Sequence, residues 1–556
     1  MVSPRGGRGG QEVMSGASGE AWVAERAAEV VEEVVGREPH ALLLYGSRIA
    51  GYGGPGSDYD ALAVVEGYRG RIRYIYRGLP GSGERVSILV VDRGWFEADA
   101  ERAFLGEFVA GRLLSIYRPV LNPGYIEDFE IRYKKRVILE EVSYLQREFC
   151  EVADDLTIPL KYVLLARLKR RMAIYPHVKY SYVNTYYGPR GAENMAWALS
   201  RLRMAAEELE AEGWLRLEGE DIVPLRRVRA RIPPSLTFIC RGVKSYAAHG
   251  LSAKVPVTVV AWEFVSKIRR EFRRPEAPEE LREPKLLLRL KTTHLLTEKL
   301  GIADVVRRVF GPDARVRRRR SAGAFSNVQI AEVETGEGVR TVAIKTYGGL
   351  TALKWAIVQL WLLDVLRFSI TPVRRLVNEY VGLTRLSRAG VEHIEPVRLL
   401  ALDWRGRRLI TEYKEGVRLS DYIVAGGAEA VDAVRRYAEA LARLHSQGCT
   451  LGDTKPQNAI VLRDGRIAIV DLEQWGRGSR AWDAALALHY MFKLRLRPRM
   501  LEDVVRAFIE GYLEGGGRPE DLRAAAAIRY VRPFAVLTNP YVLLRIRRSL
   551  TRAVQA

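Results

Sequence analysis

Hydrophobic positions recur with two different periods in the first part of the chain. Residues 18–35 (SGEAWVAERAAEVVEEVV) carry apolar side chains at helical spacing, which predicts an amphipathic helix. The apolar runs 41–45 (ALLLY), 59–65 (YDALAVV) and 85–91 (RVSILVV) are short and bounded by turn residues, which predicts strands. Residues 20–125 are therefore expected to form a mixed sheet covered by helices.

Helical spacing dominates the following region, residues 126–285. A helix expected from about Glu193 to Glu212 precedes two short strands around the turn 218–221, and a helix followed by a hairpin is the ending of a winged-helix unit. The alternative is a helical connector with a small hairpin that binds nothing. The residues that would suit nucleic acid here are tyrosines and neighbouring cations: Tyr180, Tyr182, Tyr186, Tyr187, Lys179 and Arg190.

One apolar stretch, 350–368 (LTALKWAIVQLWLLDVLRF), is nearly long enough to span a bilayer. It contains Lys354, Asp364 and Arg367, each of which is costly in lipid. These charges do not share one helical face, so the stretch is also a poor surface-lying amphipath. We therefore expect a helix packed inside the protein and no membrane span.

Composition narrows the class of protein. The chain has 556 residues, enough for about three or four domains, and its formal net charge of +21 favours polyanionic partners such as nucleotides or RNA. Its three cysteines are far apart, which argues against a disulfide framework and favours the cytoplasm. Residues 1–19 lack the apolar core of a signal peptide and are expected to be a flexible tail. The many arginines and few labile residues are typical of a thermophile.

Two carboxylates stand close together at the start of the predicted strand 59–65. Asp58 and Asp60 are two residues apart, so their side chains share one face of the strand. Such a pair repels itself unless a cation lies between the oxygens, and Mg²⁺ or Mn²⁺ prefers oxygen ligands. The preceding Gly46-Ser47 turn lets backbone N–H groups approach a triphosphate. Together these features predict a phosphoryl-handling site.

This arrangement resembles the DNA polymerase beta-type nucleotidyltransferase superfamily in its minimal form, over about residues 20–125. The features that carry the resemblance are a strand, Gly-Ser, a spacer of ten residues and D-x-D on a second strand. The resemblance implies that Gly46 and Ser47 bind the nucleotide. It also implies that Asp58 and Asp60 are catalytic and hold the metal.

The same resemblance asks for a third carboxylate on a later strand. Asp92, at the end of the run 85–91, is one candidate third metal ligand, but the position within that run is Ser87. Glu107 is a further option. Without a competent third carboxylate, nucleotide binding would persist while transfer would be slow or absent.

A second set of phosphate-binding features begins near residue 305. Residues 315–320 (RVRRRR) precede a strand, the small-residue turn SAGAFS and a returning strand that ends in TVAIK, which would form a flap over phosphates. Gly323 and Ser326 belong to this turn and are expected to bind ATP. Lys345, on the buried face of its strand, needs an anionic partner, for which Glu379 is the candidate. The lysine would then contact the α- and β-phosphates.

The stretch LARLHSQGCTLGDTKPQNAIVLRDGRIAIVDLEQW contains G-D-x-K-x-x-N, a strand pair and then an aspartate. Asp453 is predicted to accept the proton of a substrate hydroxyl or to hold that hydroxyl in line. Lys455 would neutralise charge that builds on the transferred phosphoryl group. Asn458 and Asp471 are predicted to hold Mg²⁺. A loop, a hairpin and an acid after a strand would deliver all four side chains to one cleft.

These residues resemble the catalytic set of the protein-kinase-like fold, in an atypical, RIO-like form, over about residues 305–530. The resemblance implies a two-lobed ATP-using kinase of the Ser/Thr type. Asp471-Leu472-Glu473 replaces D-F-G, and only eleven residues separate Asp471 from Asp483, so no long activation loop fits there. Regulation by phosphorylation of such a loop is therefore not expected. Asp483 is expected to brace the catalytic loop rather than to perform chemistry.

The predicted fold class is α+β multidomain. It combines an N-terminal mixed sheet of nucleotidyltransferase type, a mainly helical middle region and a C-terminal two-lobed kinase-like fold. The expected divisions are a tail (1–19), a nucleotidyltransferase-like domain (20–125), a middle region (126–285), a linker (286–304), a kinase N-lobe (305–415) and a C-lobe (416–556).

Three functions are compatible with these motifs, and the first is preferred. It is a bifunctional enzyme that uses ATP and Mg²⁺ or Mn²⁺, joining a nucleotidyltransferase to an atypical kinase. The second keeps the kinase active and makes the front domain a degenerate nucleotide sensor, which Ser87 favours. The third is an RNA- or ribosome-associated regulatory protein. The kinase acceptor is a protein, which D-x-K-P-x-N favours, or a small hydroxyl compound, which the missing activation loop favours.

Overall fold

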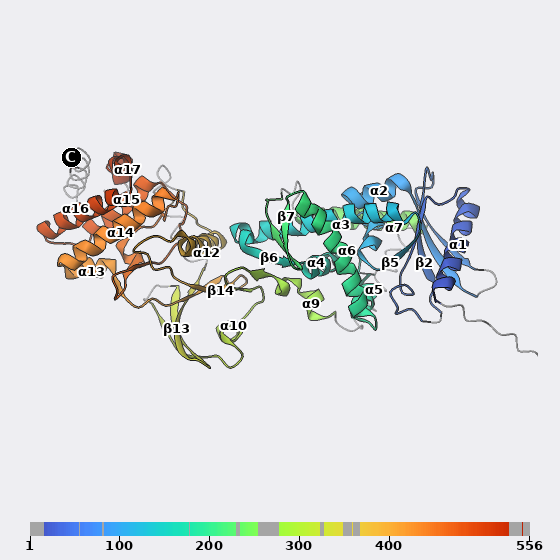
Figure 1. Cartoon of the computed structure of the whole chain (residues 1–556), viewed down its shortest axis with the longest axis horizontal. Helices are drawn as coiled ribbons and strands as arrows, with labels where there is room; N and C mark the ends of the chain where they lie inside the picture. The colour runs from blue at the N-terminus through green and yellow to red at the C-terminus, as the bar shows by residue number, and fades with distance from the viewer. Residues whose placement is uncertain are drawn as a thin grey trace, which may run out of the picture. The chain divides into compact units, whose positions relative to one another are not determined.

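The chain divides into two compact units, each with its own sheet and core (Figure 1). The N-terminal unit comprises Met1–Glu148 and Leu156–Leu288, and the C-terminal unit comprises Phe149–Asp155 and Arg289–Ala556. The computed structural model describes residues 16–54, 56–79, 83–176, 178–228, 234–253, 277–322, 327–348, 359, 367–532 and 548.

Short apolar runs between turns build a five-stranded sheet in the N-terminal unit, in the order β3-β4-β2-β1-β5. Strand β2 runs parallel to β4, and the other neighbouring strands are antiparallel. Helix α1 (Gly16–Val35) covers one face, because its apolar stripe packs on alternate strand residues such as Leu42, Ala63 and Ile88 (Figure 1). The strands are β1 (Ala41–Tyr45), β2 (Tyr59–Val65), β3 (Ile72–Gly78), β4 (Arg85–Asp92) and β5 (Tyr117–Leu121).

Helices make up most of the remaining N-terminal unit, and the predicted order of helix and hairpin is present. Helix α6 (Gly191–Ala211) is followed by the antiparallel strands β7 (Leu215–Glu218) and β8 (Asp221–Pro224). Strand β6 (Leu156–Pro159) pairs with β8. The other helices are α2 (Arg93–Arg102), α3 (Pro123–Phe149), α4 (Leu160–Ile174), α5 (Val178–Tyr187), α7 (Pro234–Ala253) and α9 (Glu279–Arg282), with the 3-10 turns η1 (Ala110–Leu114) and η3 (Pro284–Leu287).

A buried ion cluster ties the helices of this unit together. Glu107 follows α2 and is 2% exposed. Its carboxylate lies 2.9–3.4 Å from four guanidinium groups on α3, α4 and α7: those of Arg136, Arg167, Arg171 and Arg241. Burial opposes ionisation of Glu107, but the arginines outweigh it and lower its pKa to about 2. Glu107 is therefore a structural residue and not a third metal ligand beside Asp58 and Asp60.

The C-terminal unit begins with a six-stranded sheet in the order β10-β14-β15-β13-β12-β11. Helix α10 (Ile302–Phe310) packs on the face that carries Ala331, Val342 and Ile344. Helix α12 (Pro372–Ala389) starts at Thr371, whose side chain accepts a hydrogen bond from the Arg374 backbone N–H. The strands are β10 (His294–Leu296), β11 (Arg315–Ser321), β12 (Val328–Thr335), β13 (Gly338–Thr346), β14 (Leu399–Asp403) and β15 (Arg408–Glu412).

The rest of this unit is a helical lobe with a small sheet. Helix α14 (Ala428–Ser446) packs along α16 (Pro498–Glu514), and the two ribbons run side by side in Figure 1. The small sheet has the order β16-β17-β18. The other elements are α13 (Leu419–Ala425), α15 (Arg480–Phe492), α17 (Pro519–Ala525), α18 (Ile528–Val531), β16 (Val417–Arg418), β17 (Ala459–Val461), β18 (Ile467–Ile469), η2 (Cys150–Asp155) and η4 (Pro456–Asn458).

Two expected boundaries differ from the observed elements. The N-lobe was expected to start at residue 305, but this position lies inside α10, and β10 already pairs with β14 before it. The expected linker 286–304 therefore contributes to the lobe. The expected division at 125/126 falls within α3, and both of its sides belong to one compact unit.

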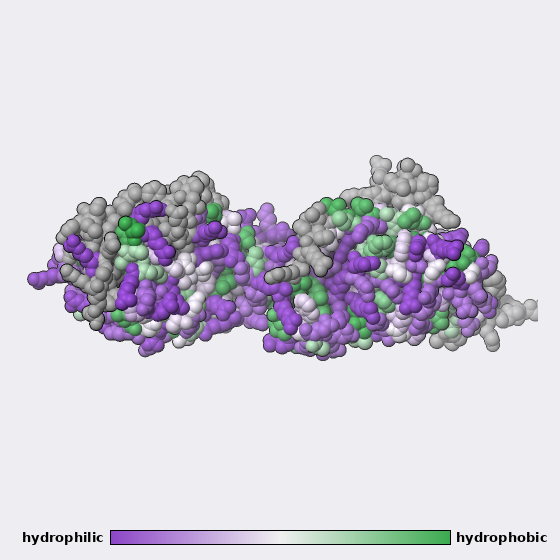
Figure 2. All heavy atoms as spheres, turned by 90° about the horizontal axis from the view of Figure 1, so that it is seen from above, coloured by the Kyte–Doolittle hydropathy of each residue, from purple (hydrophilic) through white to green (hydrophobic). Residues whose placement is uncertain are grey.

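The described helices cover only part of the expectation that the chain has no membrane span. Most of the predicted helix 350–368 lies outside the described residues. Within the described part of the chain, no helix combines the length and hydropathy needed to cross a membrane. Hydrophilic side chains predominate on the face drawn in Figure 2, with small hydrophobic patches between them.

Candidate active site

Lys345, on β13, is the centre of an ion cluster that is mostly buried, with Asp471 partly exposed. Its Nζ lies 2.6 Å from Glu379 Oε2 on α12, 2.5 Å from Asp471 Oδ1 and 3.2 Å from Glu473 Oε1. Tyr347 also donates a hydrogen bond to Glu379, at 2.6 Å. Burial would lower the pKa of Lys345, but the three carboxylates outweigh it and raise that pKa well above its usual value. The strand lysine thus has the anionic partner that its position required.

The carboxylates of this cluster outnumber its lysine. Oxygen atoms of Glu379, Asp471 and Glu473 all lie within 4.8 Å of one another. Burial raises the pKa of Glu379 to about 7, which Lys345 opposes and Asp471 reinforces. Hard oxygen donors with excess negative charge fit a divalent cation such as Mg²⁺. The donor set around Asp471 therefore suits the predicted metal.

Glu473 was not singled out as a site residue by the sequence, and it links α12 to the segment after β18. Its carboxylate accepts a hydrogen bond from Arg375 at 2.9 Å, and its backbone carbonyl accepts one from Asn378 Nδ2 at 2.9 Å. The next residue, Gln474, accepts a hydrogen bond from the Ser369 backbone N–H at 2.8 Å. The contacting residues are 95 to 105 positions apart in sequence, so local spacing gave no signal for them. The acid at the position of the usual glycine in D-F-G was the available clue.

The catalytic loop brings together three of the predicted residues. Lys455 Nζ lies 2.9 Å from the carboxylate of Asp453, and Asn458 Nδ2 donates a hydrogen bond to the Asp453 backbone oxygen at 3.0 Å. Asp453 is 8% exposed. Burial raises the pKa of this carboxyl, Lys455 opposes the shift and Asp471 adds to it. A carboxylate with a raised pKa accepts a proton more readily, which suits a general base.

Asp483, on α15, braces this loop as predicted. Its Oδ2 accepts a hydrogen bond from the Leu451 backbone N–H at 2.7 Å, and its Oδ1 accepts one from Gly452 at 2.8 Å. His445 Nε2 lies 3.1 Å from the same carboxylate. Gly452 has a φ of +74°, and a Cβ there would lie 2.3 Å from the backbone oxygen of Gln474. The loop is therefore fixed by a buried acid and by a glycine that no other residue can replace without movement.

Two predicted ATP contacts cannot be placed. Gly323 and Ser326, in the turn between β11 and β12, lie outside the described residues. Their role in binding ATP stays a sequence prediction.

The N-terminal site is built on the turn between β1 and β2. Gly46 has a φ of +86°, and a Cβ on it would lie 2.1 Å from Asp60 Oδ2, so only glycine lets this carboxylate lie against the turn. The Gly46 carbonyl accepts a hydrogen bond from Ala50 at 3.0 Å, and the Ser47 carbonyl accepts one from Tyr52 at 3.0 Å. The structure thus brings Gly46 and Ser47 together with Asp60 at one end of the sheet.

Both acids of the D-x-D pair have a cationic neighbour. Asp58 Oδ1 forms an ion pair with Arg85 at 2.8 Å. Burial raises the pKa of Asp60 to about 6, Arg112 opposes the shift and Asp58 reinforces it. Asp58 immediately precedes β2 and Asp60 is the second residue of that strand, and two carboxylates so close together along the chain fit Mg²⁺ or Mn²⁺.

The third carboxylate is where the structure corrects the sequence prediction. In the parallel register of β2 and β4, Asp60 lies opposite Ser87, whereas Asp92 lies opposite Val65. Asp92 is therefore five residues farther along the strand, about 16 Å away at 3.3 Å per residue. It forms an ion pair with Arg71 at 3.4 Å instead. Asp92 is not a third metal ligand beside Asp58 and Asp60. The position that faces Asp60 holds the hydroxyl of Ser87.

Comparison with known proteins identifies the domain at the C-terminal site. Residues 382–522 match the model of the APH family, described as "Phosphotransferase enzyme family". The C-terminal region contains a domain of this phosphotransferase family. The match includes Asp453, Lys455, Asn458 and Asp471, and it supports a transferase of phosphoryl groups.

Solved structures and curated proteins add the following. The choline kinase LicA from Streptococcus pneumoniae is similar over 46% of this chain and 97% of its own, with 12% identity and a TM-score of 0.24. LicA in complex with AMP is similar over 45% of this chain and 97% of its own, with 12% identity and a TM-score of 0.25. A comparison with curated proteins gave no match. The nucleotidyltransferase resemblance of the N-terminal unit stays a prediction.

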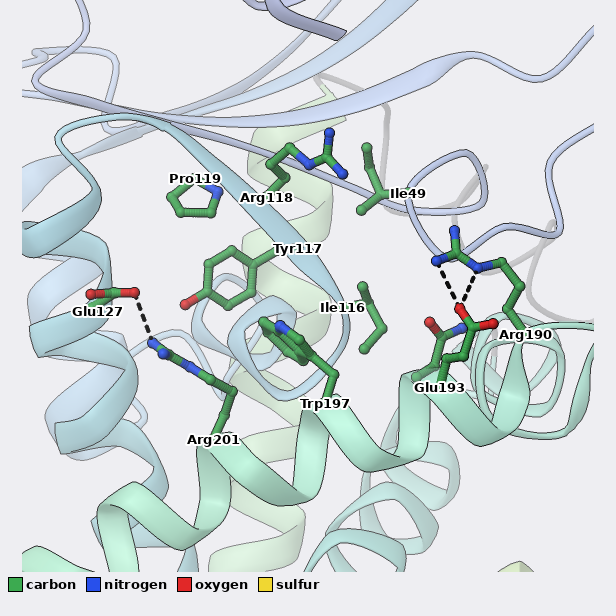
Figure 3. A pocket seen from close by; sticks show the side chains of 11 residues that line it. Ile49, Ile116, Tyr117, Arg118, Pro119, Glu127, Arg190, Glu193, Trp197 and Arg201 are labelled. Carbon is green, nitrogen blue, oxygen red and sulfur yellow. Dashed lines mark hydrogen bonds and ion pairs between the residues drawn. The ribbon is translucent and has the colours of Figure 1, made fainter. Parts of the chain in front are cut away.

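A cavity of about 440 Å³ lies beside the N-terminal site, between β5 and α6 (Figure 3). Ile49, which follows the Gly46-Ser47 turn, lines it together with Trp197. Its guanidinium groups already have acidic partners: Arg190 with Glu193, Arg201 with Glu127 and Arg118 with Glu20. The cavity therefore offers no uncompensated cation to a phosphate, and we assign it no ligand.

Two observations in the region of α5 and α6 disagree with the predicted binding of nucleic acid. Tyr182 and Tyr186 are 5% and 3% exposed, so they are core residues and cannot stack on bases. The exposed face of the second half of α6 is acidic, with Glu207, Glu208 and Glu210. Acidic side chains repel phosphates, so this face does not suit nucleic acid.

Proposed function

We propose that the C-terminal unit is an Mg²⁺-dependent kinase that transfers the γ-phosphoryl group of ATP to an acceptor hydroxyl. The observation that carries this proposal is the single loop that holds Asp453, Lys455 and Asn458. That loop is braced by Asp483, and the negative charge of Asp471 contributes to the raised pKa of Asp453. The match to a phosphotransferase family over 382–522 supports it.

The chemistry follows from these side chains. Asp453 accepts the hydroxyl proton while the acceptor oxygen forms a bond to Pγ and the bond from Pγ to the ADP oxygen breaks. Lys455 stabilises the negative charge on the transferred group, and Lys345 holds the α- and β-phosphates. Asp471 and Asn458 would hold Mg²⁺, which supplies charge neutralisation on the phosphates. The products are ADP and a phosphorylated acceptor.

Two features of the chain favour different acceptors. The sequence D-x-K-P-x-N is the form found in protein kinases and favours a serine or threonine hydroxyl of a protein, which is the acceptor that we propose. The segment after Asp471 is short, with eleven residues before Asp483, and favours a small hydroxyl compound. Supplying acceptors of both kinds separates the two.

For the N-terminal unit, we propose a nucleotidyltransferase-type site that binds a nucleoside triphosphate. The observation that favours it is the Asp60 carboxylate held against the Gly46 turn, with Asp58 two residues earlier, just before β2. If the site transfers, an acceptor oxygen attacks Pα and pyrophosphate leaves. Ser87 in place of a third carboxylate favours the alternative, a site that binds the nucleotide without transfer.

One experiment tests both sites. The protein is incubated with Mg²⁺ and ATP labelled at either the α- or the γ-phosphate, and label is followed on the protein itself, on added protein and RNA, and on a set of small hydroxyl compounds. We expect Asp453→Ala to lower γ-label transfer by about 10²- to 10⁴-fold, because the base is lost. We expect Asp58→Ala/Asp60→Ala to remove only α-label incorporation or nucleotide binding at the N-terminal site.

The matched control is Asp464→Ala, which removes an exposed aspartate from the β17–β18 hairpin of the same lobe. It is expected to keep γ-label transfer. Unchanged γ-labelling in Asp453→Ala would overturn the kinase proposal. Unchanged binding of α-labelled ATP in the Asp58→Ala/Asp60→Ala variant, measured with Asp471→Asn also present, would overturn the N-terminal site.

A further inference from the structure

Strand β11 carries a row of arginines at the edge of the N-lobe sheet. Five of its seven residues are arginines, at positions 315 and 317–320, and all five are exposed. The sheet order places β11 at the edge, with β12 as its neighbour. Arg318 and Arg320 are two residues apart, about 6.8 Å along the strand.

These arginines differ from others in the same lobe because they have no acidic partner among the described residues. Arg307 pairs with Asp304, Arg308 pairs with Glu298 and Arg340 pairs with Glu337. Two acids of β12 lie opposite β11 in the register, Glu332 and Glu334, but neither comes within ion-pair distance of it in the part of the chain that the structure describes. The row is therefore a concentrated, uncompensated positive charge.

The register shows where the row points. Arg320 lies opposite Ile330, which lies opposite Ala343 on β13, two residues from Lys345. Partners across a sheet share a face, so Arg320 and Arg318 lie on the face from which Lys345 projects. Arg319 lies opposite the core residue Ala331 and so belongs to the other face. The arginines thus surround the edge on both sides, and two of them lie over the nucleotide side of the lobe.

We propose that the arginine row of β11 binds the phosphate backbone of a single-stranded nucleic acid. Guanidinium groups bind phosphate oxygens bidentately, and their spacing along one face is of the same order as that of neighbouring phosphates in an extended strand. A chain that bends around the edge can contact both faces, which a flat protein strand cannot. The row belongs to the C-terminal unit, whereas α6, whose exposed second half is acidic, belongs to the N-terminal unit.

An acidic peptide that adds to the sheet as a further strand is the competing partner. The register shifts between Val316 and Arg318, so β11, the edge strand of the sheet as far as the structure describes it, carries a bulge. Bulges and charged side chains at an edge oppose the addition of a strand. The geometry therefore favours a ligand that is held by its phosphates and not by backbone hydrogen bonds.

The test compares two variants that lose the same charge. Arg317, Arg318, Arg319 and Arg320 are replaced by Gln in the first. The control replaces four arginines of the C-lobe that do have acidic partners: Arg435, Arg436, Arg443 and Arg466. Binding of a fluorescein-labelled single-stranded RNA of mixed sequence is measured by anisotropy at several salt concentrations, with the same sequence as DNA and a polyglutamate peptide as further probes.

We expect the β11 variant to bind RNA at least about tenfold more weakly and the slope of log Kd against log salt to fall by about 3, since each phosphate contact of a single strand contributes about 0.7. The control should keep most of the affinity. Replacing the same four β11 residues by Lys should keep the salt slope, which separates loss of charge from misfolding. Equal weakening in both Gln variants, or tighter β11-dependent binding of polyglutamate than of RNA, would overturn the proposal. Asp453→Asn should bind RNA like the wild type, so this inference stands apart from the kinase proposal.

Discussion

In the nucleotide site that we propose for the N-terminal unit, Ser87 is the residue that decides between binding and transfer. It occupies the strand position opposite Asp60, where a carboxylate would complete a set of three. A hydroxyl brings no negative charge, so in the proposed site only Asp58 and Asp60 would hold a cation. At this single position the difference between a nucleotide sensor and a transferase is one side chain.

Changing Ser87 to Asp should therefore strengthen metal binding. We expect Ser87→Asp to tighten Mn²⁺ binding at the N-terminal site at least about tenfold, because a third carboxylate adds a ligand and a charge. Transfer of α-label should rise with it. Calorimetric titration with Mn²⁺ and ATP measures the affinity, in an Asp471→Asn background that weakens metal binding by the other site.

Asp92 supplies the control for this experiment. Asp92→Asn removes a carboxylate from the same strand, but one that pairs with Arg71 at the far end. It should leave Mn²⁺ binding at the N-terminal site as in the parent protein. If Asp92→Asn weakens binding and Ser87→Asp does not strengthen it, the register argument is wrong.

At the scale of elements, α15 positions the catalytic loop through one buried acid. Asp483 accepts hydrogen bonds from two backbone N–H groups of the loop and contacts His445 on α14. Replacing it with Asn keeps the size of the side chain but puts a donor where one N–H group needs an acceptor. The loop and both helices would lose their common anchor.

We expect Asp483→Asn to lower the free energy of unfolding by about 2–3 kcal/mol, since a buried donor loses its partner. It should also lower kcat for γ-label transfer more than it changes the KM for ATP, because Asp453 is misplaced while Lys345 is not. Urea unfolding and steady-state kinetics measure the two effects. Asp503→Asn, on α16, is the control, and an unchanged kcat in Asp483→Asn would contradict the bracing role.

The elements themselves were largely predictable from sequence, and their pairing was not. The strands predicted at 41–45 and 59–65 have these bounds as β1 and β2, because each is an apolar run closed by turn residues. The loop that carries Asp453, Lys455 and Asn458 was predictable for a different reason. These residues lie close together in the sequence, so their contacts are local. Strand β3 was missed, because Arg73, Arg77 and its tyrosines hide its alternation.

What the sequence could not provide was contact between distant segments. Whether Ser87 or Asp92 faces Asp60 depends on the register of β2 against β4, which no local pattern determines. The pairing of Glu473 with Arg375 joins positions 98 apart. The buried state of Tyr182 and Tyr186 likewise depends on packing in the assembled unit.

For the molecule as a whole, the excess of positive charge is organised differently in its interior and at its edges. Inside the N-terminal unit, arginines from three helices are held by Glu107 together with Glu140. On β11 they have no such partner among the described residues. The same residue type therefore stabilises one unit and leaves a charged surface on the other.

Glu107 should make the stability of the protein depend on pH. Its pKa is lowered from 4.5 to about 2, so its contribution is fully present above pH 4.5 and is lost as pH falls toward 2. Glu107→Gln should cost about 3–5 kcal/mol at pH 7, because a buried carboxylate that contacts four arginines is removed. Urea unfolding at pH 7 and at pH 3 should show the gap between variant and wild type narrowing at pH 3.

Glu101→Gln is the matched control for this prediction. Glu101 pairs with Arg132 on the surface, where an ion pair is worth at most about 1 kcal/mol. A gap for Glu107→Gln that is as small as this, or that widens toward pH 3, would contradict the assignment of Glu107 as the structural anchor of the unit.

The segment that follows Asp471 is short, largely buried and tied to Ser369 through Gln474. In kinases with a long loop at this place, other enzymes switch catalysis on and off by phosphorylating that loop. The kinase that we propose would therefore not be switched by phosphorylation of a loop at this place. We therefore expect the rate of the proposed reaction to follow the supply of ATP and acceptor.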